Sequence, residues 1–261
     1  MIISGCSEDK PNEPQIPPEM PPQSSFIMDF DGFQQQIQMW DDPAADLASL
    51  TLENWGWSVL SIIVWNTALT VTLAIPSAAF LASFSQEPTQ QEDGSWDWTF
   101  SFTHNMIQHT AQLNGKIVNN NVEWKMFITK DGDFENFLWF TGTSDLLALE
   151  GSWTLNYSPL DPKQFMLIEW SRNVGDETAE LKYTIIESGA VNEGSYIYFG
   201  STLDIPYDHF YNIFISADNN MTNIQWNHTS KVGHVQDEKH FGNTDWYCWN
   251  EDLQDTDCPE L

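Results

Sequence analysis

Basic residues are scarce in this chain of 261 residues, which has nine Lys and Arg against 38 Asp and Glu and a formal net charge of −29. A surface this acidic repels the phosphate backbone of nucleic acids and the headgroups of anionic membranes, so neither is expected as a partner through charge. The acidic residues are spread along the chain and do not gather in one loop. That distribution favours a role in solubility over a calcium site or a site for a cationic partner.

Motifs for nucleophilic, nucleotide and metal chemistry are also missing. The sequence has no G-x-S-x-G, no phosphate-binding loop, no G-x-G-x-x-G and no H-x-H or H-E-x-x-H. We therefore assign no catalytic residue, expect no cofactor and consider an enzyme less favoured than a binding protein. A hydrolase that uses scattered carboxylates or a His-centred metal is kept as an alternative. Its weak metal-ligand candidates are His228, His234, Asp237 and His240.

The N-terminus carries a candidate targeting signal. Residues 3–6 read Ile-Ser-Gly-Cys, and six prolines follow between Pro11 and Pro22. A small residue directly before a cysteine resembles the lipobox of bacterial envelope lipoproteins. The resemblance implies that Cys6 is lipidated, that residues 1–5 are the remainder of a signal peptide, and that the protein is an outer-membrane lipoprotein of the cell envelope. Since proline-rich chain is extended and semi-rigid, residues 6–25 would be a tether between the membrane and the folded body.

Cysteine is otherwise rare, and only Cys248 and Cys258 remain once Cys6 carries lipid. They form an even pair around a short acidic segment, and we expect a disulfide that fastens the C-terminal tail. Loop-closure entropy would make this bridge worth about 2–3 kcal/mol. Such a bridge requires an oxidising compartment, which export supplies, and two free thiols are the alternative.

Charge of either sign is absent from residues 54–86. This length is enough for a membrane span. However, Ser, Thr and Asn interrupt the apolar surface, Pro76 breaks the run, and no Lys or Arg flanks either end. We therefore favour a helix buried within the protein over a transmembrane helix.

The predicted helix covers about residues 47–74, with Asp46 or Ser49 as possible N-caps, and continues in a second helical stretch near residues 77–84. A helix that is apolar on most sides must be covered on most sides. A curved sheet wrapped around it would provide that cover.

Residues 95–249 show the period-two alternation of strands with one buried face. Turn signals separate the alternating runs at short, even spacing, and no helical pattern intervenes. We predict about ten or eleven strands in an antiparallel meander, curled into a barrel or half-barrel around the helix, within one β-rich domain over residues 26–261. The clearest buried faces are Trp96, Trp98, Phe100 and Phe102; Val122, Trp124, Met126 and Ile128; Trp153, Leu155 and Tyr157; and Leu181, Tyr183 and Ile185.

This architecture resembles that of the periplasmic half-barrels that carry lipids, which implies a groove for an apolar ligand or a protein partner. Several strands carry large aromatic residues together with apolar groups on the opposite face. Our first hypothesis is a non-catalytic envelope protein with a hydrophobic or aromatic groove, and the second is an interaction module whose core is filled. The tentative groove residues are Phe137, Trp139, Trp170 and Trp226.

Overall fold

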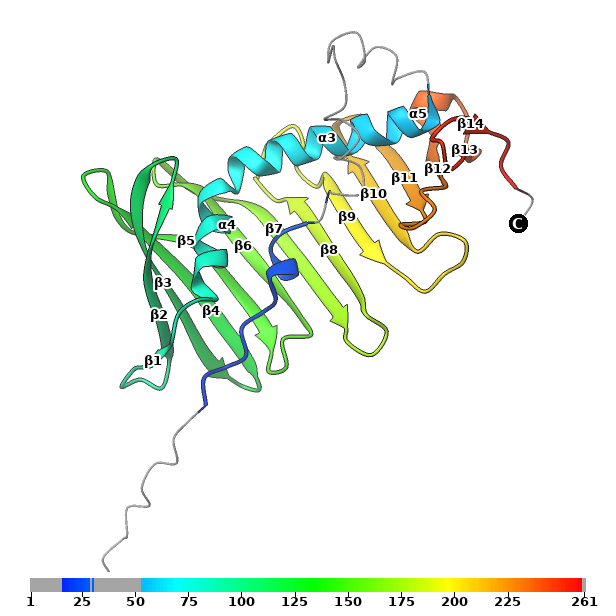
Figure 1. Ribbon diagram of the computed structural model, residues 1–261. Coiled ribbons are helices and arrows are strands. Elements are labelled where there is room, and N and C mark those ends of the chain that lie inside the picture. The colour runs from blue at the N-terminus through cyan, green and yellow to red at the C-terminus, as the bar shows by residue number, and fades with distance from the viewer. Residues whose placement is uncertain (1–15, 29, 31–52, 260–261) are drawn as a thin grey trace, which may run out of the picture.

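Fourteen strands follow one another in one antiparallel sheet, in the order β1 to β14, in the computed structural model (Figure 1). The structure describes residues 16–28, 30 and 53–259. Cys6, Asp46, Ser49 and the expected start of the helix at 47–52 lie outside the described residues. The strands are β1 (Thr89–Gln90), β2 (Trp96–His104), β3 (Ile107–Val118), β4 (Asn121–Lys130), β5 (Phe134–Asp145), β6 (Glu150–Ser158), β7 (Asp161–Asn173), β8 (Thr178–Ile185), β9 (Tyr196–Ser201), β10 (His209–Ile215), β11 (Asn220–Trp226), β12 (Gly233–Asp237), β13 (Tyr247–Trp249) and β14 (Asp255–Thr256).

The antiparallel meander is confirmed. Of the two predicted forms, a barrel or a half-barrel, the closed barrel is wrong, because the sheet stays open. Within the described part of the chain, β1 pairs with β2 and β14 pairs with β13, and these two edges do not pair with each other. The two edge strands have two residues each and lie at opposite ends of the open sheet (Figure 1). The strand count was underestimated because strands this short show no alternation in sequence.

Two helices pack on one face of the sheet. Helix α3 (Asn54–Thr72) runs along the sheet to a bend of 71°, and α4 (Ala74–Ser83) then crosses the face over β2 and β3 (Figure 1). The break falls at Leu73 and not at Pro76, which lies in the first turn of α4, where a missing N–H costs no helical hydrogen bond. Shorter helices are η1 (Gln23–Ser25), η2 (Ser216–Asp218) and α5 (Glu238–Phe241). Neither long helix by itself has the length and apolarity to cross a bilayer, although the bent pair passes both criteria together.

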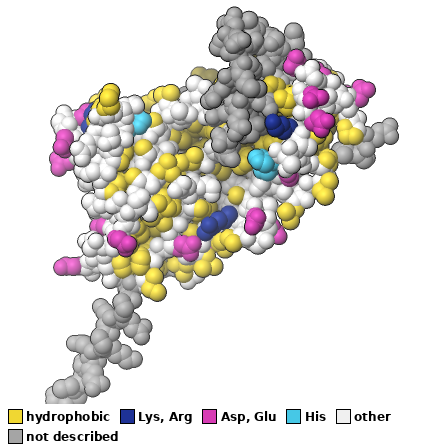
Figure 2. All heavy atoms as spheres, viewed as in Figure 1, with side chains coloured by type: hydrophobic (Ala, Val, Ile, Leu, Met, Phe, Trp, Pro, Cys, Tyr) yellow, Lys and Arg dark blue, Asp and Glu magenta, His cyan; other side chains and the backbone are white. Residues whose placement is uncertain are grey.

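We call the face that carries α3 and α4 the inner face, and the opposite face the outer face. The alternation predicted for the strands places the core on the inner face: Trp98, Phe100, Val122, Trp124, Met126, Ile128, Trp153, Leu155, Leu181 and Tyr183 are all buried there. From α3 and α4, the side chains of Ile62, Leu69 and Phe80 enter the same core. Figure 2 shows hydrophobic side chains across the middle of this face, with acidic side chains toward its ends.

Glycines within the strands explain part of the unusual Trp content. Each of them stands opposite an aromatic residue of a neighbouring strand, and the ring occupies the space that a Cβ atom would need. A Cβ at Gly142, for example, would lie 2.2 Å from the ring of Trp153. The inner-face pairs are Gly115 with Trp124, Gly142 with Trp153, Gly151 with Trp170, and Gly233 with Trp249; on the outer face Gly200 pairs with Phe210.

A segment before the helices also lies on the inner face (Figure 1). The indole of Trp153 donates to the Ser25 carbonyl at 3.1 Å, and the hydroxyl of Tyr183 donates to the Phe26 carbonyl at 2.8 Å. Pro18 and Pro21 are buried. Residues 16–25, which the sequence analysis places in the tether, therefore pack against the body.

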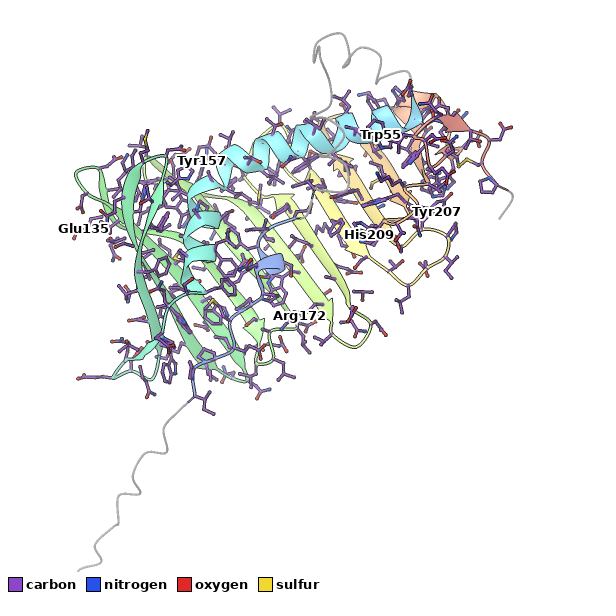
Figure 3. The ribbon with its side chains drawn as sticks, viewed as in Figure 1. Trp55, Glu135, Tyr157, Arg172, Tyr207 and His209 are labelled. Carbon is purple, nitrogen blue, oxygen red and sulfur yellow. A yellow bond between two sulfur atoms is a disulfide. The ribbon has the colours of Figure 1, made fainter. Side chains whose placement is uncertain are left out.

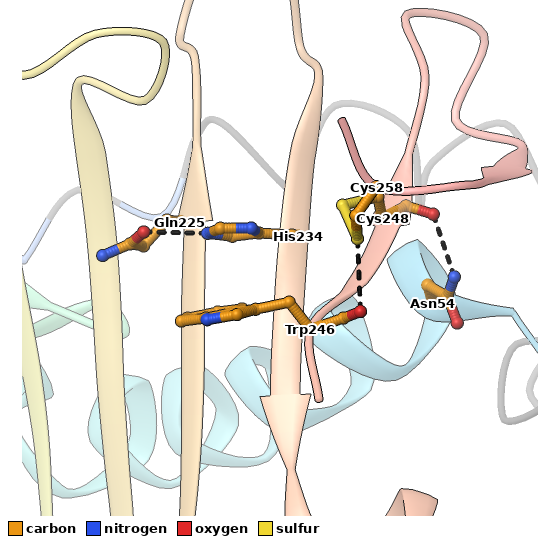
Figure 4. The surroundings of a disulfide bond; sticks show 6 residues. All are labelled: Asn54, Gln225, His234, Trp246, Cys248 and Cys258. Atoms are coloured by element: carbon orange, nitrogen blue, oxygen red, sulfur yellow. Dashed lines mark hydrogen bonds between the residues drawn. A yellow bond between two sulfur atoms is a disulfide. The ribbon is translucent and has the colours of Figure 1, made fainter. Parts of the chain in front are cut away.

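The C-terminal tail contains the expected disulfide between Cys248 and Cys258 (Figure 4). This tail also caps α3, whose own preceding residue, Glu53, provides no side-chain cap. The backbone N–H of Asn54 donates to Asp255 Oδ1 at 2.9 Å, and the Asn54 side chain donates to the Cys248 carbonyl at 2.9 Å. Residues some 200 positions apart thus complete the first turn of the helix.

Candidate functional site

The four aromatic residues predicted to form a groove lie at three separate places on the inner face. Phe137 and Trp139 on β5 contact each other, with ring centroids 5.3 Å apart. Trp170 on β7 covers Gly151. Trp226 on β11 stacks on Tyr211 at 5.2 Å. The structure thus brings Phe137 and Trp139 together and leaves the other two apart, each buried in its own part of the core.

A pocket of about 350 Å³ lies where α3 bends into α4, and we call it the bend pocket. Its size is within the range of small-molecule sites. Helix residues Val71 and Ile75 form one side, and Tyr157, labelled beside the bend in Figure 3, lines it from β6. Val71 and Leu160 at its rim are 75% and 95% exposed. The remaining lining is Thr72, Lys130, Asp133, Phe134, Trp139, Ser158 and Pro159.

The polar rim of the bend pocket is an ion pair in the β4–β5 turn. Lys130 Nζ lies 2.6 Å from Asp133 Oδ2, and both side chains are partly exposed. The floor beyond it is aromatic, because Phe134 and Trp139 pack with ring centroids 5.8 Å apart. The bend pocket can therefore hold an apolar chain, with one charged pair at its mouth.

A second pocket, of about 390 Å³, separates the first half of α3 from β10 to β12. At its base Asp237 is fully buried and accepts four hydrogen bonds. The donors are the hydroxyl of Thr222 at 2.6 Å, the side chain of Asn220 at 2.9 Å, the indole of Trp57 at 3.1 Å and the backbone N–H of His240 at 3.1 Å. Because these donors belong to α3, α5 and β11, Asp237 links both helices to the sheet.

The four metal-ligand candidates do not gather. His234 and Asp237 are three positions apart on β12 and therefore point to opposite faces of the sheet. His240 stacks on Trp57 with ring centroids 3.8 Å apart, and His228 stacks on His209 at 5.1 Å. Over the described residues, no three His, Cys, Asp or Glu side chains are placed to hold a metal ion.

A wider, open hollow lies on the outer face. It consists of two adjoining parts of about 900 and 520 Å³, which share Tyr198 and Asn212, and we call the whole the outer groove. Asn212 alternates with Ile213, which lines the pocket beneath α3, so the groove opens away from the helices. Register aligns its central row directly across the strands: Ser152, Glu169, Lys182, Tyr198, Asn212 and Asn223. Gln236 continues this row on β12, next to the lining residues.

His234 forms part of this groove. Its ring lies 3.7 Å from Trp246 and 4.2 Å from Tyr207, and its Nε2 is 2.8 Å from Gln225 Oε1 (Figure 4). Burial lowers the pKa of His234 to about 4, so the imidazole is neutral at neutral pH. Burial, helped by a hydrogen bond to Glu180, raises the pKa of Tyr198, which keeps this phenol protonated.

The sequence predicts His234 as a metal candidate and does not predict the outer groove. The missed signal was on the polar side of the strand alternation, where Tyr198, Phe210, Asn212 and Asn223 stand among residues that would otherwise only face water. Comparisons of this chain with protein-family models, with curated proteins and with solved structures found no match.

Proposed function

We propose that the protein is a non-catalytic binding protein of the bacterial cell envelope, held to the membrane by a lipid on Cys6, and that the bend pocket takes an apolar ligand. The observation that carries the ligand proposal is the pocket itself, an aromatic-floored space of about 350 Å³ left beside the helix pair. A site of this kind binds by removing apolar surface from water.

Export is supported by the disulfide between Cys248 and Cys258, which hints at an oxidising compartment. The resemblance of residues 3–6 to a lipobox supports the anchor. Labelling of growing bacteria with radioactive palmitate, with Cys6→Ser as the control, tests this part. Loss of label in the variant is expected, and equal label in both proteins would refute lipidation at Cys6.

Two changes at the rim test the pocket. Val71→Glu and Leu160→Glu place carboxylates at exposed positions of the mouth, where they cost the fold little. Matched controls are Val174→Glu and Val191→Glu, which are 64% and 83% exposed in turns elsewhere. We expect a fluorescent fatty acid to bind the full chain, and to bind the double rim variant at least tenfold more weakly, with no change in the double control.

The alternative is an interaction module without a ligand. Its supporting observation is that the chain fills its own inner face with α3, α4 and the segment around Phe26. Organic extraction of the purified full chain, read by mass spectrometry, separates the two. A clean extract together with no binding of the fatty acid would exclude the apolar ligand and favour the module.

A further inference from the structure

The outer groove carries a row of amide side chains fixed by one another. Asn212 Nδ2 donates to Asn223 Oδ1 at 2.7 Å, and Asn223 Nδ2 donates to Gln236 Oε1 at 3.0 Å. Gln236 Nε2 then donates to the Thr244 carbonyl at 2.7 Å. Each amide nitrogen has a second N–H, and each oxygen a second lone pair, beyond these bonds. The row therefore presents donors and acceptors in fixed orientations at the spacing of neighbouring strands.

Beside this row lie aromatic rings that are partly exposed. Phe210 lies flat over Gly200, where a Cβ atom would come within 2.4 Å of its ring carbons. Tyr198 packs edge-on against Phe210, with ring centroids 5.1 Å apart. Further along, Tyr207 and Trp246 pack on His234. The sheet thus offers flat apolar surfaces next to oriented polar groups, a combination that is typical of a binding surface.

The charges around the groove restrict its ligand. Its first part is lined by the carboxylates of Asp145, Glu150, Glu169 and Glu180 against the single ammonium of Lys182. Asp204 adds another carboxylate in the second part. A polyanion would be repelled, whereas a hydroxyl group can donate a charge-assisted hydrogen bond to a carboxylate.

We propose that the outer groove binds a neutral glycan chain that lies across β7 to β12. Pyranose rings have an aliphatic face that packs on an aromatic ring, and hydroxyl groups around the edge that bind amides and carboxylates. The groove supplies both, and its lining extends from β4 to β12. The site lies on the face opposite the bend pocket, so this proposal is independent of the apolar ligand.

Retention of the full chain on insoluble polysaccharides tests the proposal. The panel contains neutral polymers (cellulose, starch, xylan and a β-1,3-glucan), cationic chitosan and anionic alginate, with soluble polylysine as a separate ligand. We expect retention on at least one neutral polymer and none on alginate. Failure of every neutral polymer overturns the proposal, and binding of polylysine or chitosan alone would assign the groove to cationic ligands instead.

Variants then locate the binding. Tyr198→Ala and the pair Asn212→Ala with Asn223→Ala should each weaken glycan binding at least tenfold. The matched control is Tyr157→Ala, which removes a 45% exposed tyrosine of the bend pocket. Because Tyr198 and Asn212 are only partly buried, the variants should keep their cooperative thermal unfolding, which is measured alongside. Equal binding by folded variants and wild type would place the glycan elsewhere and contradict the proposal.

Discussion

The two faces of the sheet are built from the same strands, yet they differ in what covers them. The inner face is covered by the chain itself, with α3, α4 and the segment around Phe26 packed on rings of Trp and Phe. The outer face of β7 to β12 has partly exposed rings, amides and carboxylates. Since successive side chains of a strand point to opposite faces, one sequence can encode a core and a binding surface at alternating positions. Partly exposed aromatic residues on the outer face therefore indicate a binding surface, whereas buried aromatic residues indicate only a core.

The sharpest contrast is between buried and exposed carboxylates. Asp237→Ala removes the acceptor for four donors from α3, β11 and α5, and should lower the free energy of unfolding by about 3–4 kcal/mol, because unpaired buried donors are costly. Glu169→Ala on the outer face should change it by less than about 0.5 kcal/mol. Urea unfolding of both variants measures the difference. Similar values would mean that Asp237 does not hold the helices.

The disulfide links the two faces, because Cys248 contacts the cap of α3 and lies next to His234 in the sheet. Replacing both Cys248 and Cys258 by Ala should cost about 2–3 kcal/mol through the entropy of the unfolded chain. Asp255→Ala, which removes only the cap of α3, should cost about 1 kcal/mol. Thermal unfolding under non-reducing conditions compares them, and a larger loss for the cap than for the bridge would contradict this order.

Matched glycines probe the packing of each face. Gly142→Ala pushes a methyl group into Trp153 and into the Ser152 carbonyl, neither of which can move, and should cost about 2 kcal/mol. Gly200→Ala meets the ring of Phe210, which can tilt toward solvent, so the loss should be below about 1 kcal/mol. The second variant should instead weaken glycan binding. Equal losses of stability would show that Phe210 is as fixed as Trp153.

Histidines on the two faces give a smaller, pH-dependent effect. Burial lowers the pKa of His234 and that of His109, which is on the inner face. The unfolded chain takes up these protons at higher pH than the folded chain. The contribution of the two histidines to stability is therefore fully present above about pH 6.5 and is lost as the pH drops toward 4. His234→Gln should make the melting temperature less sensitive to pH over this interval. An unchanged pH dependence would mean that the pKa of His234 is the same in the folded and the unfolded chain.

Much of the fold was accessible from the sequence because alternation has a direct physical cause. The runs around Trp124 and Trp153 indicate one buried face, and the uncharged stretch from Asn54 indicates a covered helix. The open edges, the bend at Leu73 and the capping of Asn54 by Asp255 were not predictable, since they depend on contacts between distant residues. The scattered positions of Phe137, Trp139, Trp170 and Trp226 have the same origin, because alternation assigns a face and leaves the neighbours on that face undefined.

The assignment of glycan binding to the outer face can be tested by hydroxyl-radical footprinting of the full chain with and without a mixture of neutral oligosaccharides. We expect labelling to fall at Tyr198 and Phe210 and to stay constant at Tyr157. Protection of Tyr157, or no protection at Tyr198 and Phe210, would contradict this assignment.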